Sequence, residues 1–179
     1  ARERGLAGLT KSPGGLDVLA HIDLVKHPPE SLTEVFQRVV GALQELQRQD
    51  HRMENAGSPH PAALVEAAQR IASASQVCQL PNLEIPEEKL GVTEGVLSAR
   101  LIASSLLTEK ALRQLLNSQL FIDVGHHQVK LYPDELPPFL AAQRLASLVK
   151  SPEHAHKLVQ TFSWRSPTGE QGVYRQFLP

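Results

Sequence analysis

Residues 119–132 read QLFIDVGHHQVKLY and divide into two strand-forming runs around a short turn. The first run, 119–124, is apolar and rich in residue types that favour strands. The second run, 128–132, alternates polar and apolar residues with a period of two, which is typical of a strand with one buried face. The residues between them, Gly125-His126-His127, have the character of a turn. The stretch therefore predicts a β-hairpin over about 119–132.

Helices are predicted on both sides of the hairpin, which needs them because an isolated two-stranded hairpin is barely stable in water. Residues 93–107 form one helix with a break near its end, and Thr108 caps a second helix whose leucines fall on one side. After the hairpin, a helix starts near Glu135 with Pro137 and Pro138 in its first turn, where a missing N–H is tolerated. Its expected inward residues are Phe139, Ala142, Leu145, Ala146 and Val149.

Two more helices are predicted nearer the start of the chain. Residues 13–27 form a short helix behind a Gly/Pro-containing start. Residues 31–49 carry apolar side chains at three- and four-residue steps, which draws one apolar stripe along a helix. Ser31 and Glu34 have the spacing of a capping box, and Glu34 and Arg38 can pair one turn apart.

Prolines indicate where the remaining helices and irregular segments begin and end. Ser58-Pro59 has the pattern of a helix start, and the helix is expected to end before Pro81. Residues 81–91 hold two prolines and an acidic pair and are expected to be irregular. Ser151-Pro152 starts a last helix, and the chain from Trp164 onward is expected to be a loop.

The fold class expected from these elements is mainly α: a helical bundle with a winged-helix-like module that carries one β-hairpin at about 119–132. Helix, helix, hairpin and helix follow one another across 93–150, and the hairpin would be the wing. We expect a helical lid-like segment at 1–90 and the winged-helix-like module with its trailing helix at 91–179. Whether the two segments share one core is left open by the sequence.

Composition places the chain among ordinary globular proteins. Its 179 residues can bury a core, and hydrophobic residues make up 41% of them. The formal net charge is −1, from 18 Lys and Arg against 19 Asp and Glu. This balance argues against nucleic acid or a membrane surface as the main partner, since both favour a strongly positive protein. A local basic patch is still compatible with it.

The single cysteine, Cys78, can form no internal disulfide, and no apolar run approaches the roughly 20 residues of a membrane helix. No signal-peptide pattern follows Ala1. We therefore expect a cytoplasmic location and no membrane partner. The chain starts without Met, which suggests a piece of a longer protein, although removal of Met before Ala1 would look the same.

Motifs for common chemistries are missing from the sequence. It contains no G-x-x-x-x-G-K-[ST], G-x-S-x-G, H-E-x-x-H or C-x-x-C. We therefore expect this segment to have no catalytic residue, no metal site and no bound cofactor of its own. A small helical enzyme would need a pocket with convergent titratable groups, for which the sequence offers no candidates.

Two histidine pairs are candidate metal ligands with simpler explanations. His126 and His127 are adjacent in a hairpin and point to opposite faces unless the turn bends them together. His154 and His156 lie two residues apart on a predicted helix and face different directions. Both pairs are interpreted as surface residues. The other candidates, interpreted as loop, helix-start or small boundary residues, are Glu87, Glu88, Asp134, Glu135 and Cys78.

DNA binding is the alternative use of a winged helix. The helix before the wing can enter a DNA groove, and here it would present Lys110 and Arg113, followed by Gln114 and Asn117. Two cations are few, and Glu109 adjoins them, so packing against protein is the favoured interpretation of this helix.

The stretch from Thr108 to Val149 resembles the end of the NTPase module in STAND proteins of the NACHT type, which are large signal-transducing P-loop ATPases. The resemblance lies in Leu115–Phe121, then Gly125, then Val129–Leu131, and in Phe139-Leu140-Ala141-Ala142, which is similar to the E-Y-L-A-A helix of that family. Ser12-Pro13 with Leu16 and Leu19 is similar to the start of the family's helical lid, and Phe162 to Leu178 to its bridge into C-terminal repeats.

Two departures from the family pattern stand in the same stretch. The family usually has a His-Arg pair between the second strand and the helix, where this chain has Pro133 and Asp134. The glutamate before the aromatic residue is replaced by Pro138. These changes put the family's polar contacts at those positions in doubt.

The resemblance implies that the chain is the lid and winged-helix region that follows an ATPase core. It implies a regulatory and scaffolding arm that closes over bound ADP and moves on nucleotide exchange to expose an oligomerisation surface, in bacteria often for phage defence. ATP or ADP would be bound by the parent protein, with Pro13 near the nucleotide. The partners would be other domains of the same polypeptide and further copies of the parent. The alternatives are a stand-alone winged-helix DNA-binding regulator and a helical protein-interaction adaptor.

Overall fold

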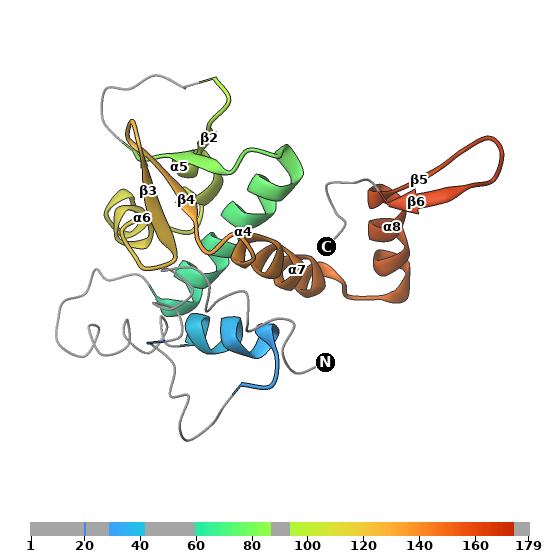
Figure 1. Cartoon of the computed structure of the whole chain (residues 1–179), viewed down its shortest axis with the longest axis horizontal. Helices are drawn as coiled ribbons and strands as arrows, with labels where there is room; N and C mark the ends of the chain where they lie inside the picture. Colours follow the sequence, from blue (N-terminus) through green and yellow to red (C-terminus); the bar gives the residue numbers. More distant parts are fainter. Residues whose placement is uncertain (1–19, 21–28, 42–59, 87–93, 174–179) are drawn as a thin grey trace.

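The computed structural model describes residues 20, 29–41, 60–86 and 94–173, which combine helices with a small mixed sheet (Figure 1). The expectation of a mainly helical chain therefore holds in its coarse form. The helix predicted at 13–27 lies outside the described residues, apart from residue 20. The structure describes residues 32–41 of the helix predicted at 31–49, and these are helical.

The start of the 32–41 helix is capped as its sequence predicts, with one change of partner. Ser31 Oγ accepts the backbone N–H of Glu34 at 3.2 Å. The Glu34 carboxylate reaches back to the N–H of Glu30 at 2.8 Å, rather than to Ser31, and also pairs with Arg38. This helix buries one apolar face, made of Val35, Phe36, Val39 and Val40.

Helix α4 (Pro61–Cys78) is the longest described helix and lies at the centre of the molecule (Figure 1). His60 caps its start through Nδ1, which accepts the N–H of Ala62 at 3.2 Å. The first helical residue is thus Pro61, two residues later than the Ser58-Pro59 pattern predicts, because His60 replaces Ser58 as the cap. The helix ends at Gln79, whose left-handed backbone (φ 56°) directs its N–H to the carbonyl of Ser75. The predicted end before Pro81 is confirmed.

A four-stranded mixed sheet forms around the predicted hairpin. The hairpin strands β3 (Phe121–Gly125) and β4 (Gln128–Leu131) are confirmed. Strands β1 (Asn82–Glu84) and β2 (Leu97–Ser98) extend the sheet in the order β2-β1-β4-β3, with β1 antiparallel to β4 and parallel to β2. The expectation of one hairpin is therefore too narrow, and the irregular structure predicted at 81–91 is wrong over β1.

The segment before α6 is less helical than predicted. Only helix α5 (Ala99–Ala103) forms within 93–107, because the chain is extended through β2 immediately before it. Ser98 is the last residue of β2 and caps α5, because its hydroxyl accepts the N–H of Leu101 at 3.4 Å. The apolar residues 96 and 97 fit the helical period, but residue 96 lies in a bend and Leu97 in β2, so the predicted helix start is wrong.

Helix α6 (Glu109–Leu116) begins where the sequence predicts. The Thr108 hydroxyl accepts the N–H of Ala111 at 3.3 Å, which caps the helix. Every apolar residue of α6 is buried, namely Ala111, Leu112, Leu115 and Leu116. The remaining positions face solvent, apart from half-buried Glu109. The short helix is therefore strongly two-faced.

Helix α7 (Leu136–Leu148) carries two prolines at its start, as predicted. The face that it buries differs from the predicted one. Ala142 and Ala146, expected to point inward, are exposed. The buried residues are instead Leu136, Pro137, Leu140 and Ala141. An alanine-rich helix offers two apolar faces of similar character, and the position of α4 decides which one is covered.

Helix α8 (Pro152–Phe162) follows and is capped by Ser151, as predicted. It leads directly into β5 (Ser163–Arg165), which pairs antiparallel with β6 (Gln171–Val173). The loop expected from Trp164 is therefore wrong over these two strands, and residues 174–179 lie outside the described residues. In Figure 1, α8 and this second hairpin lie beyond the end of α7, away from the four-stranded sheet.

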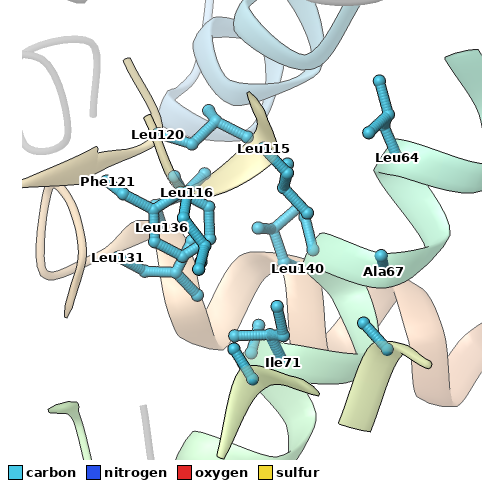
Figure 2. Packing of buried hydrophobic residues seen from close by; sticks show 14 of the residues in the cluster. Leu64, Ala67, Ile71, Leu115, Leu116, Leu120, Phe121, Leu131, Leu136 and Leu140 are labelled. Atoms are coloured by element: carbon cyan, nitrogen blue, oxygen red, sulfur yellow. The ribbon is translucent and has the colours of Figure 1, made fainter. Parts of the chain in front are cut away.

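One cluster of buried side chains joins α4, α6, α7, the sheet and the 32–41 helix. Figure 2 shows Leu140 of α7 between Ile71 of α4 and Leu115 of α6, with Leu64 of α4 at the edge of the cluster. Burial of such a side chain contributes about 1.5–3 kcal/mol. The cluster includes residues on both sides of position 90, and the division at that position stays a prediction.

Polar side chains fix the angle between α4 and α7 at the edge of this core. Glu66 Oε1 accepts from Arg70 at 2.9 Å and from Arg144 of α7 at 3.2 Å. Gln69 donates to Gln143 at 3.2 Å, one turn further along. These bonds join residues that lie 74 and 78 positions apart in the sequence, and so hold the module together as a unit.

Candidate interaction surfaces

The candidate metal ligands are separate and exposed. His126 and His127 form the turn of the β3–β4 hairpin, and His154 and His156 lie on α8. The ring nitrogen of His156 makes a hydrogen bond of 2.9 Å with Gln160. Among the described residues, no group of three or more His, Cys, Asp and Glu could hold a metal ion.

The other candidates for chemistry also lie at the surface. Asp134 is exposed and accepts from Lys130 Nζ at 3.0 Å, which is a surface ion pair, and Glu135 beside it is exposed as well. Cys78 is the last residue of α4, so its predicted place near a helix end is confirmed, but it is exposed, so its interpretation as a small core or boundary hydrophobe is wrong. Glu87 and Glu88, like Pro13, lie outside the described residues.

An open depression near the end of α4 offers no chemistry of its own. It is lined by Ser75, Gln76, Gln79 and Pro81. None of these four side chains titrates in the ordinary pH range. Two surfaces of the described residues are considered next.

The first surface is the polar side of α6, called here the α6 face. It consists of Lys110, Arg113, Gln114 and Asn117. All four are exposed, and their spacing of three, one and three residues places them along one stripe of a helix. The structure thus brings together the two residues, Lys110 and Arg113, that the DNA-binding alternative names.

Glu109 organises the cations beside the α6 face. Its Oε1 accepts from Arg113 at 2.9 Å, and its Oε2 lies 3.7 Å from Arg100 of α5. Arg100 is a member of this surface that sequence reasoning missed, because it lies on a different helix and only the α5–α6 packing brings it near. Three cations against one carboxylate leave this part of the surface with a net charge of +2.

The second surface is the α8 stripe, made of Ala155, Leu158, Val159 and Phe162. Their spacing of three, one and three residues is that of a helix face meant for burial. Nevertheless α8 contains no buried residue, and Val159 is 61% exposed. Sequence periodicity marks such a stripe but gives no signal of whether the same chain covers it.

Further apolar groups are exposed near the α8 stripe in sequence. Trp164 of β5 is 41% exposed, and Leu148 at the end of α7 is 46% exposed. The indole of Trp164 lies against Gly172 of β6, where an added Cβ would come within 2.8 Å of the ring nitrogen. The glycine thus leaves room for the large ring next to the β6 backbone.

Two carboxyl groups have perturbed acidity, and both lie away from the α6 face. The N–H of Glu30, followed by Arg38, holds the pKa of Glu34 below its usual value. The hydroxyl of Ser151 and the backbone of α8 lower the pKa of Glu153. Both residues act at helix starts, so the shifts reflect capping and not catalysis.

Comparison with known proteins adds no relative. No family model, no curated protein and no solved structure matches the chain. Within the part that the structure describes, no helix is long and apolar enough to cross a membrane.

Proposed function

We propose that the chain is a non-catalytic regulatory and scaffolding arm of a larger NACHT-type signalling NTPase. In this role it couples the nucleotide state of the parent protein to a change of conformation and to oligomerisation, in bacteria as part of defence. The observation that carries the proposal is the α8 stripe. The chain fully buries no residue of this apolar helix face and leaves Val159 61% exposed, so the face is suited to contact another domain or subunit.

The order of elements supports the family assignment within this proposal. Helices α5 and α6, the β3–β4 hairpin and α7 follow one another as in a winged helix, with the hairpin as the wing. The Phe139-Leu140-Ala141-Ala142 segment, which resembles the family's helix motif, lies on α7. Leu140 and Ala141 are buried, and the ring of Phe139 packs at a tilt against that of Phe36, with 5.5 Å between the centroids.

The molecule has a central module that shares one core, and α8 with its hairpin projects from that module. This arrangement supports the regulatory role within the proposal. The α4–α7 contact, with its Glu66 and Gln69 bonds, makes the central module suited to move as one body. The projecting α8 and its hairpin carry the exposed stripe at a distance from that module (Figure 1). An arm that moves between two positions according to the bound nucleotide needs a rigid body and an exposed contact surface.

The first test is the coding sequence upstream of Ala1. The proposal expects a P-loop followed by a Walker-B acidic strand within the few hundred preceding codons. A start codon at Ala1, with no such motif upstream, would leave a stand-alone binding module as the better account.

A biochemical test uses the parent protein as encoded. Val159→Glu places a charge in the α8 stripe, whereas Gln160→Glu places the same charge at the next exposed position of the same helix, outside the stripe. We expect only Val159→Glu to abolish the increase in mass, by light scattering, when ADP is replaced by a slowly hydrolysed ATP analogue. Equal assembly by both variants would contradict a scaffolding role for this surface.

A helical protein-interaction adaptor is the second candidate, and the same exposed stripe favours it. An adaptor would bind its partner whatever the nucleotide. If Val159→Glu weakens partner binding equally in ADP and in the ATP analogue, the adaptor role is favoured over the nucleotide-coupled arm.

A further inference from the structure

We propose that the α6 face, together with Arg100, forms a contact site for double-stranded DNA. This site does not depend on the regulatory role proposed above. It rests on three observations: the composition of the exposed side of α6, the arrangement of charge around Glu109, and the hairpin that follows the helix.

The exposed side of α6 carries hydrogen-bond donors and no large apolar group. Lys110 and Arg113 are followed along the same stripe by Gln114 and Asn117. Lys and Arg bind phosphate oxygens, while Arg, Gln and Asn also form paired hydrogen bonds with the edges of bases. Protein–protein interface cores are instead enriched in aromatic residues, Met and Arg and depleted in Lys, and of the enriched types the stripe has only Arg. Because all four residues are exposed, and not packed against protein as their sequence favoured, the stripe fits a nucleic acid better than a protein core.

The charges near the start of α6 favour an anionic partner. Glu109 holds Arg113 at 2.9 Å and lies 3.7 Å from Arg100, so the carboxylate brings two guanidinium groups to one place. Each guanidinium has five N–H donors, and most of these stay available to a phosphate. Lys110 adds a third cation on the same turn. The chain as a whole is nearly neutral, so the field is local.

The width of an α-helix suits the major groove of a B-form duplex. An α-helix with its side chains is about 10–12 Å across, and the groove is about 12 Å wide. The β3–β4 hairpin lies beside α6 in Figure 1 and exposes His126 and His127 at its turn.

The test measures binding of the full chain to a fluorescently labelled 20-base-pair DNA duplex by anisotropy. We expect binding at 50 mM salt, with a slope of about −2 to −3 for log K against log salt, because two to three phosphates are neutralised. An RNA duplex of the same sequence should bind more weakly, since its deep, narrow major groove does not admit a helix.

Two substitutions should act in opposite directions. Lys110→Ala should weaken binding about tenfold at 50 mM salt and reduce the salt slope by about 0.9. Glu109→Gln keeps a hydrogen-bond acceptor for the arginines but removes the negative charge, so it should tighten binding several-fold. Lys157→Ala, at an exposed lysine of α8, is the matched control and should leave binding unchanged. Thermal unfolding of each variant shows whether its fold is intact.

The proposal fails if no binding is seen at 50 mM salt. It also fails if Lys110→Ala and Lys157→Ala weaken binding equally, or if RNA and DNA duplexes bind equally well, because either result would indicate general attraction to polyanions. Tighter binding of polyglutamate than of DNA would overturn it in favour of an acidic protein partner.

Discussion

The turn of the β3–β4 hairpin places two histidines in a backbone conformation that residues other than glycine seldom adopt. His126 has φ 54° and His127 has φ 59°, so both central residues of the two-residue loop are left-handed. A turn of this kind matches the right-handed twist of the strands, which is why hairpins favour it. Histidine enters this region more readily than most residues, whereas β-branched residues almost never do.

Substitutions at His126 should therefore separate by backbone preference. His126→Asn is expected to leave the free energy of unfolding unchanged or to raise it by up to about 1 kcal/mol. His126→Val is expected to lower it by about 1–2 kcal/mol, because the branched side chain opposes positive φ. Urea unfolding of the two variants measures the difference. Equal stability of the Asn and Val variants would mean that the turn relaxes to another conformation.

Glu34 predicts a specific pH dependence. The N–H of Glu30, and then Arg38, hold the pKa of the folded-state carboxyl below its usual value of 4.5. A lowered folded-state pKa means that the ionised form stabilises the fold. This stabilisation is fully present above the unfolded-state pKa and is lost as the pH falls through the lower folded-state pKa.

The expected outcome concerns the difference between the native chain and Glu34→Gln. The variant should be less stable at pH 7, and the difference should shrink as the pH falls below 4.5. Unfolding by urea at a series of pH values measures it, and NMR titration of Glu34 gives its pKa directly. A difference that stays constant from pH 7 to 3 would show that the carboxylate bonds contribute nothing.

At the scale of elements, the contact between α4 and α7 carries the core. Leu140 of α7 is fully buried at 0% exposure, whereas Leu148 at the end of the same helix is 46% exposed. Leu140→Ala should lower the free energy of unfolding by about 2–5 kcal/mol, through lost burial and the cavity that remains. Leu148→Ala should change it by less than about 1 kcal/mol. Similar values from chemical denaturation of the two variants would contradict the packing.

At the scale of the whole molecule, the structure predicts two levels of stability. The central module shares one buried cluster, while α8 buries no residue. Amide hydrogens of α4 and α7 should therefore exchange with a free energy close to that of global unfolding, and those of α8 through local opening of much lower free energy. Hydrogen exchange followed by mass spectrometry measures both. Equal protection of α8 and α4 in a monomer would contradict this division.

Some residues of the candidate surfaces could be predicted from the sequence, and others depend on the tertiary structure. Lys110 and Arg113 could be placed on one helix face from their spacing alone. Arg100 could not, because its approach to Glu109 depends on how α5 packs against α6. The α8 stripe could be recognised from its periodicity, but its exposure depends on whether another segment of the chain packs against it.

The sequence by itself determined the elements whose signals are local. The caps at Ser31, Thr108 and Ser151, the proline start of α7 and the β3–β4 hairpin are all confirmed. In each case the stabilising contact joins residues only a few positions apart, so the information lies within one short window.

Only the tertiary structure decided the short strands and the buried faces. Strand β1, beside two prolines, has three residues and is held by backbone bonds to β4, which lies more than 40 residues further along the chain. The inward face of α7 was set by α4, because alanines leave either face acceptable. These features depend on contacts between distant segments, and their free energy exists only once the chain has brought those segments together.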